Sequence, residues 1–142
     1  MTQQITIRGK VVRTVFYNQK TRFRIAIFRM EDSRQDIRVL GFQLPPPLGD
    51  ILELTGGYET NPPYGKQFRI LRFKEVKQAS IEELRKYLSS PATGVGETLA
   101  YKIIQKFGSD TGMVLMKNIN RLLEIEGLSE KTIAHIRKKL KV

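Results

Sequence analysis

Residues 1–78 alternate apolar and polar side chains with a period of two, which is typical of β-strands that bury one face. Five short segments follow the pattern: residues 5–7, 23–27, 37–39, 52–58 and 68–70. Turn-forming residues separate them at 18–21, 31–35, 45–50 and 61–65. In the second segment the alternation predicts that Phe23, Ile25 and Ile27 pack inward, while Arg22 and Arg24 face solvent.

Five short strands in so small a region leave long unpaired edges if they form an open sheet. Closing the sheet into a barrel removes those edges, and the five-stranded OB barrel is the architecture that fits. Such a barrel binds single strands on one face and between the loops that join strands 1 to 2 and 4 to 5. We therefore expect an OB-like β-barrel over residues 1–78.

From residue 79 the period changes to 3.6, which is typical of amphipathic helices. Ile81, Leu84 and Leu88 form one apolar stripe, and Ser80 with Glu83 has the spacing of a capping box. Further helices are expected over 97–107, after Ser109 or Asp110 with an interruption at Gly112, in a turn capped by Asn120, and over 130–140. The fold class is therefore α+β, with an all-α domain over residues 79–142.

Two glycine-centred segments, 93–96 and 126–129, each precede a helix in this second region. Apolar residues follow the two glycines at matching offsets: Val95, Ala100 and Ile103 after Gly94, and Leu128, Ile133 and Ile136 after Gly127. Bare glycines allow a backbone to approach a phosphate, and the free N–H groups of the next helical turn point at it. The repeat predicts a tandem helix-hairpin-helix domain that binds the DNA backbone.

The charge of the chain agrees with a polyanionic partner, since 25 Lys and Arg against 14 Asp and Glu give a formal net charge of +11. No apolar run approaches the roughly 20 residues that span a bilayer, and the N-terminal segment lacks the features of a secretion signal. We expect a cytoplasmic location and no membrane partner. With no cysteine and one histidine, His135, the sequence offers no thiolate or multi-histidine metal site.

The candidate DNA-binding residues combine aromatic rings, cations and the two hairpins. In the barrel they are Tyr17, Arg22, Arg24, Tyr64 and Lys66; in the helical domain they are Gly94, Val95, Gly96, Lys102, Gly127, Ser129 and Lys131. The alternative interpretation is structural: the tyrosines cap the barrel and the lysines are solvated surface. Ser129 stands where the motif usually has glycine, so the second hairpin is expected to hold a phosphate less closely.

No catalytic residue is expected in this chain. The sequence lacks the Gly-x-x-x-x-Gly-Lys-Ser/Thr phosphate loop of an ATP-driven motor. A glycine is followed by a lysine at Gly9 and at Gly65, but in neither place is the next residue serine or threonine. The acidic pairs at 31–32 and 82–83 fall in a loop and at a helix start. His135 is expected to be a packing or surface residue, and no cofactor is expected.

Several segments carry a resemblance to a known family: residues 9–12, 15–18, 54–56, 63–68, 94–96, 107–108 and 121–127. In these the chain resembles the N-terminal region of the stand-alone bacterial RecD-like DNA helicases. The run from Tyr64 to Phe68 is the most discriminating. The resemblance implies a monomer that binds single-stranded or forked DNA in repair or recombination, followed in the same polypeptide by a 5′-to-3′ motor that uses ATP and Mg²⁺.

Two other functions fit the same order of domains. A Holliday-junction-binding subunit resembling RuvA would be tetrameric and would prefer four-way junctions. A protein-docking module would use the apolar rim of the barrel and Pro45–Pro47 to recruit a partner or regulate a motor, and it would not bind DNA.

Overall fold

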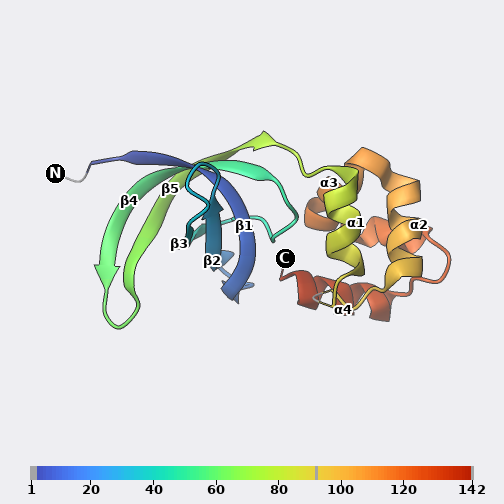
Figure 1. Cartoon of the computed structure of the whole chain (residues 1–142). Helices are drawn as coiled ribbons and strands as arrows, with labels where there is room; N and C mark the ends of the chain where they lie inside the picture. The colour runs from blue at the N-terminus through green and yellow to red at the C-terminus, as the bar shows by residue number, and fades with distance from the viewer. Residues whose placement is uncertain (1–2, 92, 142) are drawn as a thin grey trace. The chain divides into compact units, whose positions relative to one another are not determined.

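The computed structural model describes residues 3–91 and 93–141 (Figure 1). The chain forms two compact units, residues 1–78 and residues 79–142. We refer to them as the sheet unit and the helical unit.

The sheet unit contains five strands, in the five segments where the alternation predicts them. They are β1 (Ile5–Asn18), β2 (Phe23–Met30), β3 (Asp36–Phe42), β4 (Ile51–Asn61) and β5 (Gly65–Lys77). Their hydrogen-bonded order is β1-β2-β3-β5-β4, and the pairing of β1 with β4 closes the sheet into a barrel. The β3–β5 pair is parallel and the other pairs are antiparallel. Closure gives every strand two neighbours and protects the strand edges.

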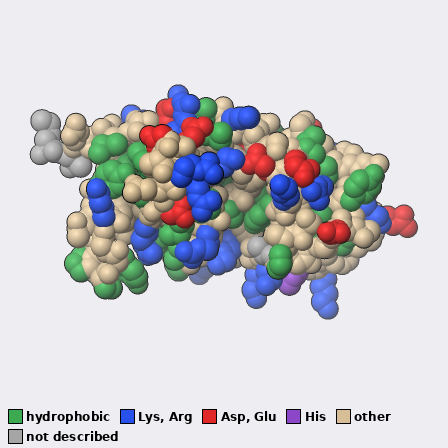
Figure 2. All heavy atoms as spheres, viewed as in Figure 1, with side chains coloured by type: hydrophobic (Ala, Val, Ile, Leu, Met, Phe, Trp, Pro, Cys, Tyr) green, Lys and Arg blue, Asp and Glu red, His purple; other side chains and the backbone are tan. Residues whose placement is uncertain are grey.

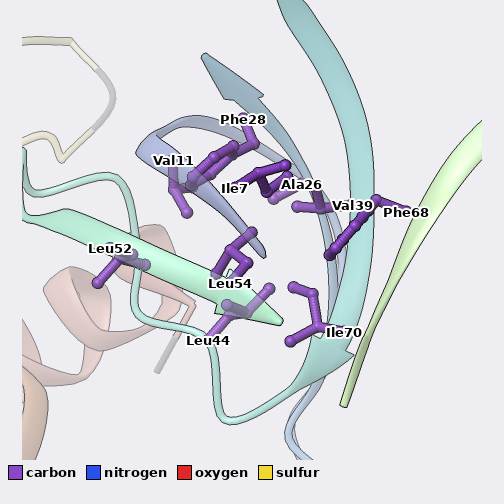
Figure 3. Close-up of a cluster of buried hydrophobic side chains, with 10 residues drawn as sticks. All are labelled: Ile7, Val11, Ala26, Phe28, Val39, Leu44, Leu52, Leu54, Phe68 and Ile70. Atoms are coloured by element: carbon purple, nitrogen blue, oxygen red, sulfur yellow. The ribbon is translucent and has the colours of Figure 1, made fainter. Parts of the chain in front are cut away.

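The core of the sheet unit consists of aliphatic and phenylalanine side chains that converge inside it (Figure 3). Its buried members are Ile7, Val11, Ala26, Phe28, Val39, Leu44, Leu52, Leu54, Phe68 and Ile70. All five strands contribute to it, and Leu44 follows the end of β3. The prediction of which face of β2 is buried is wrong, however. Arg24, Ala26 and Phe28 lie inside, whereas Phe23 and the isoleucines between them are only half-buried.

The buried face of β2 is opposite to the predicted one because β2 carries apolar residues on both faces. Alternation identifies two faces of a strand but does not determine which one turns inward when both are apolar. The neighbouring strands decide it: Ala26 lies opposite Val39 on β3, and Phe28 lies opposite Val11 on β1, both of which are buried. Ala26 and Phe28 are both fully buried in the core of the sheet unit.

The helical unit contains α1 (Ile81–Ser89), α2 (Glu97–Phe107), α3 (Thr111–Lys117) and α4 (Glu130–Leu140), with short 3₁₀ segments η1 (Gly108–Asp110) and η2 (Ile119–Glu124). The capping box at the start of α1 is confirmed: the Glu83 backbone N–H donates to Ser80 Oγ at 3.1 Å, and the Ser80 N–H donates to Glu83 Oε1 at 3.2 Å. No helix in the described ranges is long and apolar enough to cross a membrane.

Two local expectations in this unit are wrong. Helix α3 continues through Gly112, because burial of Val114 and Leu115 outweighs the low helix propensity of one glycine. The turn before α4 begins after Asn118 rather than at Asn120, whose Oδ1 instead accepts a bond from Arg137 Nη2 at 3.4 Å. Tertiary contacts override the local preference at both places.

Candidate nucleic-acid interface

The outer side of the β1–β2–β3 sheet carries exposed aromatic rings. Two register shifts in β1, between Val11 and Arg13 and between Thr14 and Phe16, change which side chains point outward. As a result Phe16 lies on the outside opposite Ile25 and is 47% exposed.

A second exposed ring lies on the next strands along this outer side. Phe42 at the end of β3 is 60% exposed and pairs with Phe23 on β2, with their ring centres 5.2 Å apart in an edge-to-face arrangement. Sequence reasoning missed Phe16 and Phe42. The adjacent aromatics at positions 16 and 17 were the available signal, since one of two neighbouring strand residues must point outward.

The turn between β4 and β5 adds a third ring to the sheet unit. Tyr64 is 61% exposed, and the Arg38 guanidinium carbon lies 4.3 Å from the centre of its ring. Lys66 on β5 places its Nζ 4.3 Å from the centre of the Tyr58 ring. Arg38, which contacts Tyr64, and the exposed Phe42 are four residues apart on β3, so their backbone positions are separated by about 13 Å along the strand. The predicted Tyr64 and Lys66 are therefore exposed beside aromatic or cationic partners, as base stacking requires.

Arg24 does not have the exposure that a DNA contact needs. It is 1% exposed, its Nε donates to the backbone oxygen of Leu44 at 2.9 Å, and one terminal nitrogen donates to Thr14 Oγ1 at 2.7 Å. Its guanidinium also lies 4.4 Å from the centre of the half-buried Tyr17 ring. Tyr17 lies opposite Arg24 in the β1–β2 pair, beyond the two register shifts of β1, and the reversed phase of β2 turns Arg24 inward. The prediction that Arg24 faces solvent is therefore wrong, whereas Tyr17 keeps part of its surface in solvent.

Arg22 remains on the surface, in the turn between β1 and β2. Its φ of 63° lies in the left-handed region, its N–H donates to the Asn18 oxygen at 2.7 Å, and its own oxygen accepts from the Gln43 N–H at 2.9 Å. The backbone of Arg22 therefore ties the turn to the end of β3 and leaves the side chain in solvent.

Carboxylates neutralise several arginines of the sheet unit. Arg8 pairs with Glu53 at 3.1 Å, Arg29 with Asp36 at 2.8 Å, and Arg69 with Glu59 at 2.7 Å. The hydrogen bond from Arg69 holds the pKa of Glu59 below its usual value of 4.5, and Gln67 adds a second donor. Hydrogen bonds from Arg29 and Arg8 lower the pKa of Asp36 and Glu53 in the same way.

These lowered pKa values predict an acid-sensitive stability. A carboxyl group whose pKa is lower in the folded than in the unfolded chain stabilises the fold above the unfolded pKa. That contribution is lost as the pH falls through the folded pKa. When the pH is lowered from about 5 to about 3, the free energy of unfolding of the variant Glu59→Gln should therefore fall less than that of the unsubstituted chain. Urea unfolding at a series of pH values measures this, and parallel curves would contradict it.

The hairpin at residues 93–96, which we call the first hairpin, is shaped by a buried threonine and two glycines. Thr93 Oγ1 donates to the Leu88 oxygen at 2.5 Å and accepts from the Val95 N–H at 3.3 Å. Gly94 and Gly96 have φ angles of +71° and +84°, a region that favours glycine. The N-cap of α2 is Gly96, and it makes no side-chain capping bond. The first-turn N–H groups of α2 thus have no side-chain acceptor at the cap, and a Cβ on Gly96 would meet open space.

The second hairpin, residues 126–129, differs at the start of its helix. Gly127 also has a positive φ, +98°, but the N-cap residue Ser129 accepts a bond from the Thr132 N–H at 3.3 Å. This serine occupies the end of α4 that a phosphate would otherwise approach. Leu128 and Val95 are both buried, so each hairpin anchors itself through the apolar residue after its glycine.

His135 on α4 lies beside the first hairpin. Its Nε2 is 2.9 Å from the position that a Cβ on Gly94 would take. Lys131 and Lys138 are exposed four residues before and three residues after it, on the same side of the helix. Figure 2 shows the histidine with basic side chains on both sides of it. Lys102 on α2 is also exposed. Among the described residues no cluster of acidic or histidine side chains could hold a metal ion.

A small five-stranded barrel with an exposed aromatic and cationic side defines an OB-type unit. Residues 4–78 match the family described as the OB-fold domain of the ATP-dependent DNA helicase YrrC. This match covers more than half of the chain, which therefore belongs to that family. The resemblance to RecD-like helicases is confirmed for this region.

A curated relative points the same way. Over 101 residues the chain is 28% identical to the ATP-dependent RecD2 DNA helicase of Deinococcus radiodurans, covering 69% of this chain and 14% of that protein. The chain thus spans about a seventh of the relative's length.

Solved structures with a similar arrangement are more distant. One is the OBody AM3L09 bound to hen egg-white lysozyme (13% identity, TM-score 0.39, 53% of this chain and 82% of that chain). Another is asparaginyl-tRNA synthetase from Pyrococcus horikoshii (13% identity, TM-score 0.38, 73% and 30%).

Proposed function

We propose that this chain is the DNA-binding region of a RecD-like 5′-to-3′ helicase, and that it holds single-stranded or forked DNA during repair or recombination. The observation that carries the proposal is the first hairpin, where two glycines with positive φ precede a helix whose N-cap offers no side-chain acceptor. The family to which residues 4–78 belong supplies the helicase context.

In the helical unit, binding is to the sugar-phosphate backbone. The open N–H groups at the start of α2 and the positive end of its helix dipole favour a phosphate oxygen, and the bare glycines allow close approach. Lys131, Lys138 and Lys102 add positive charge without fixing a sequence. The two hairpins act as a tandem helix-hairpin-helix domain in which the first makes the close backbone contact. The second contributes mainly its lysines, because Ser129 already caps its helix.

In the sheet unit, binding is to unpaired bases. Phe16, Phe42 and Tyr64 offer exposed rings on which bases stack, and Lys66 and Arg22 provide cations for the adjoining phosphates. Stacking on aromatic faces does not distinguish sequences, which suits a protein that must follow any strand. No bond is made or broken at either unit; ATP and Mg²⁺ belong to a motor elsewhere in the polypeptide.

Salt dependence tests the electrostatic part of this proposal. Each phosphate that the chain neutralises on a single strand should contribute about −0.7 to the slope of log affinity against log salt concentration. Roughly four such contacts would weaken binding about fiftyfold between roughly 50 and 200 mM salt. Fluorescence anisotropy with a labelled oligonucleotide measures the slope, and an affinity that did not change with salt would contradict phosphate binding.

Substrate preference separates the proposal from its two alternatives. Single strands and forks should bind more tightly than a four-way junction, and the chain should sediment as a monomer. Preference for the four-way junction by a tetramer would favour the junction-binding subunit. Binding of a protein partner with no affinity for DNA would favour the docking module.

A further inference from the structure

Arg38 on β3 is a half-buried arginine whose charge no carboxylate balances among the described residues. Arg8, Arg29 and Arg69 of the same unit each lie within 3.1 Å of an acidic oxygen. Arg24 is buried, and it is satisfied by the protein's own oxygens. Arg38 makes one contact of another kind, with the ring of Tyr64.

The position of the Arg38 head group is costly for the protein alone. Its Nε is buried and has no hydrogen-bond partner in the described part of the chain. An unpartnered buried donor destabilises a fold, and the stacking of a guanidinium on a tyrosine offsets part of that cost. A cation that is already partly stripped of water and held in one plane binds an anion with little further loss of solvation or side-chain freedom.

Tyr64 is in turn prepared for a second partner. The guanidinium lies over one face of its ring, with its carbon 4.3 Å from the ring centre, yet the residue is 61% exposed. Rings of this kind stack bases on their free face, and a cation on the opposite face holds the ring in place.

We propose that Arg38 and Tyr64 form a subsite for one nucleotide of a single strand. The base stacks on the free face of Tyr64, and the adjoining phosphate accepts hydrogen bonds from the terminal nitrogens of Arg38. The subsite rests on the proposed function and deepens it, because it names the unit that holds the unpaired base. A base inside a duplex is covered on both faces by its neighbours, so this subsite selects single strands.

The test compares two polymers of the same charge, an oligo-dT of about 15 nucleotides and a strand of equal length made of abasic sites. The 142-residue chain is titrated against each by fluorescence anisotropy. Tyr64→Leu should weaken oligo-dT binding about fivefold to a hundredfold, the range for one stacked base. It should weaken abasic binding by a smaller factor, because Arg38 keeps its charge but loses the ring that holds its guanidinium. Tyr64→Phe, which keeps the ring, should bind both polymers like the unsubstituted chain.

Arg38 is tested by the same pair of polymers. Arg38→Gln should weaken binding of both polymers more than Arg72→Gln does, since Arg72 is an exposed arginine on β5 and provides the matched loss of one charge. Arg38→Lys keeps the charge but not the planar fork, so it should lose oligo-dT affinity while retaining most of its abasic affinity. Circular dichroism and thermal midpoints confirm that each variant is folded.

The outcomes separate this subsite from the broader proposal. An unchanged ratio of oligo-dT to abasic affinity in Tyr64→Leu would overturn the subsite, and so would equal losses for Arg38→Gln and Arg72→Gln. In both cases DNA binding itself would stand. If the unsubstituted chain bound neither polymer at low salt, the proposed function would fail first.

Discussion

Replacing Phe28 by alanine should lower the free energy of unfolding of the sheet unit by about 3–5 kcal/mol. Phe28 is fully buried in the cluster in Figure 3, so the variant loses its buried apolar surface and leaves a cavity that the closed sheet cannot fill. A small domain has a total stability of about 5–15 kcal/mol, so the loss brings the unit close to unfolding. Urea denaturation followed by circular dichroism measures it.

Phe42 provides the matched control, because it is the same residue type on the adjacent strand but is 60% exposed. Phe42→Ala removes an edge-to-face contact with Phe23 and should cost only about 0.5–1.5 kcal/mol. It should instead weaken the binding of single strands, whereas Phe28→Ala in its folded fraction should not. Similar losses of stability in both variants would show that the inner and outer faces of the sheet are wrongly assigned.

The double variant Gly94→Val with Gly96→Val should weaken binding to forked DNA about tenfold or more, the effect of losing a hydrogen bond to a charged group. Both positions have φ angles in the region that side chains with a Cβ disfavour. A valine at Gly94 would press on the end of His135, and one at Gly96 would stand in the open space that a phosphate would use. The sheet unit should remain folded. Anisotropy with a forked duplex, together with the thermal midpoint, measures the two effects separately.

Gly108→Val is the control for backbone strain in this experiment. Gly108 has a φ of +52° and open space around it, but it ends α2 rather than beginning it. The negative end of the helix dipole does not attract phosphate, so this variant should lose stability without losing DNA affinity in proportion. A folded double variant at Gly94 and Gly96 that bound DNA as tightly as Gly108→Val would remove the first hairpin from the mechanism.

The sequence was sufficient to predict an element wherever its formation depends mainly on residues close together in the chain. The helix over 97–107 has an apolar stripe and a terminal glycine, and its observed bounds are Glu97–Phe107. The capping box at Ser80 needs only two residues three positions apart, so it too could be predicted. Gly112 and Asn120 could not be judged locally, because buried neighbours hold the first in a helix and a hydrogen bond from Arg137 engages the second.

The candidate site divides in the same way. Tyr64 lies in the turn between β4 and β5, where side chains are exposed whatever the strand register, and Lys66 is the second residue of β5, beside that turn. The structure leaves both on the surface. Tyr17, Arg24 and Phe16 lie within strands, where the exposed face depends on two bulges in β1 and on the pairing of β2. The role proposed for Arg38 could not be predicted from the sequence. It depends on the Tyr64 ring in the turn between β4 and β5, and on a buried Nε that has no hydrogen-bond partner in the described ranges.

The amino-acid sequence by itself determined the number and order of strands and helices, the change from one unit to the next, the positive charge and the glycines of the hairpins. These depend on periodicity, composition and backbone freedom, which are properties of nearby residues. Only the tertiary structure decided which face of β2 is buried, which arginines are neutralised and that Arg38 lies against Tyr64. Each of those depends on how side chains are finally placed, because burial and ion pairing are set by whatever the closed sheet and the packed helices bring into contact.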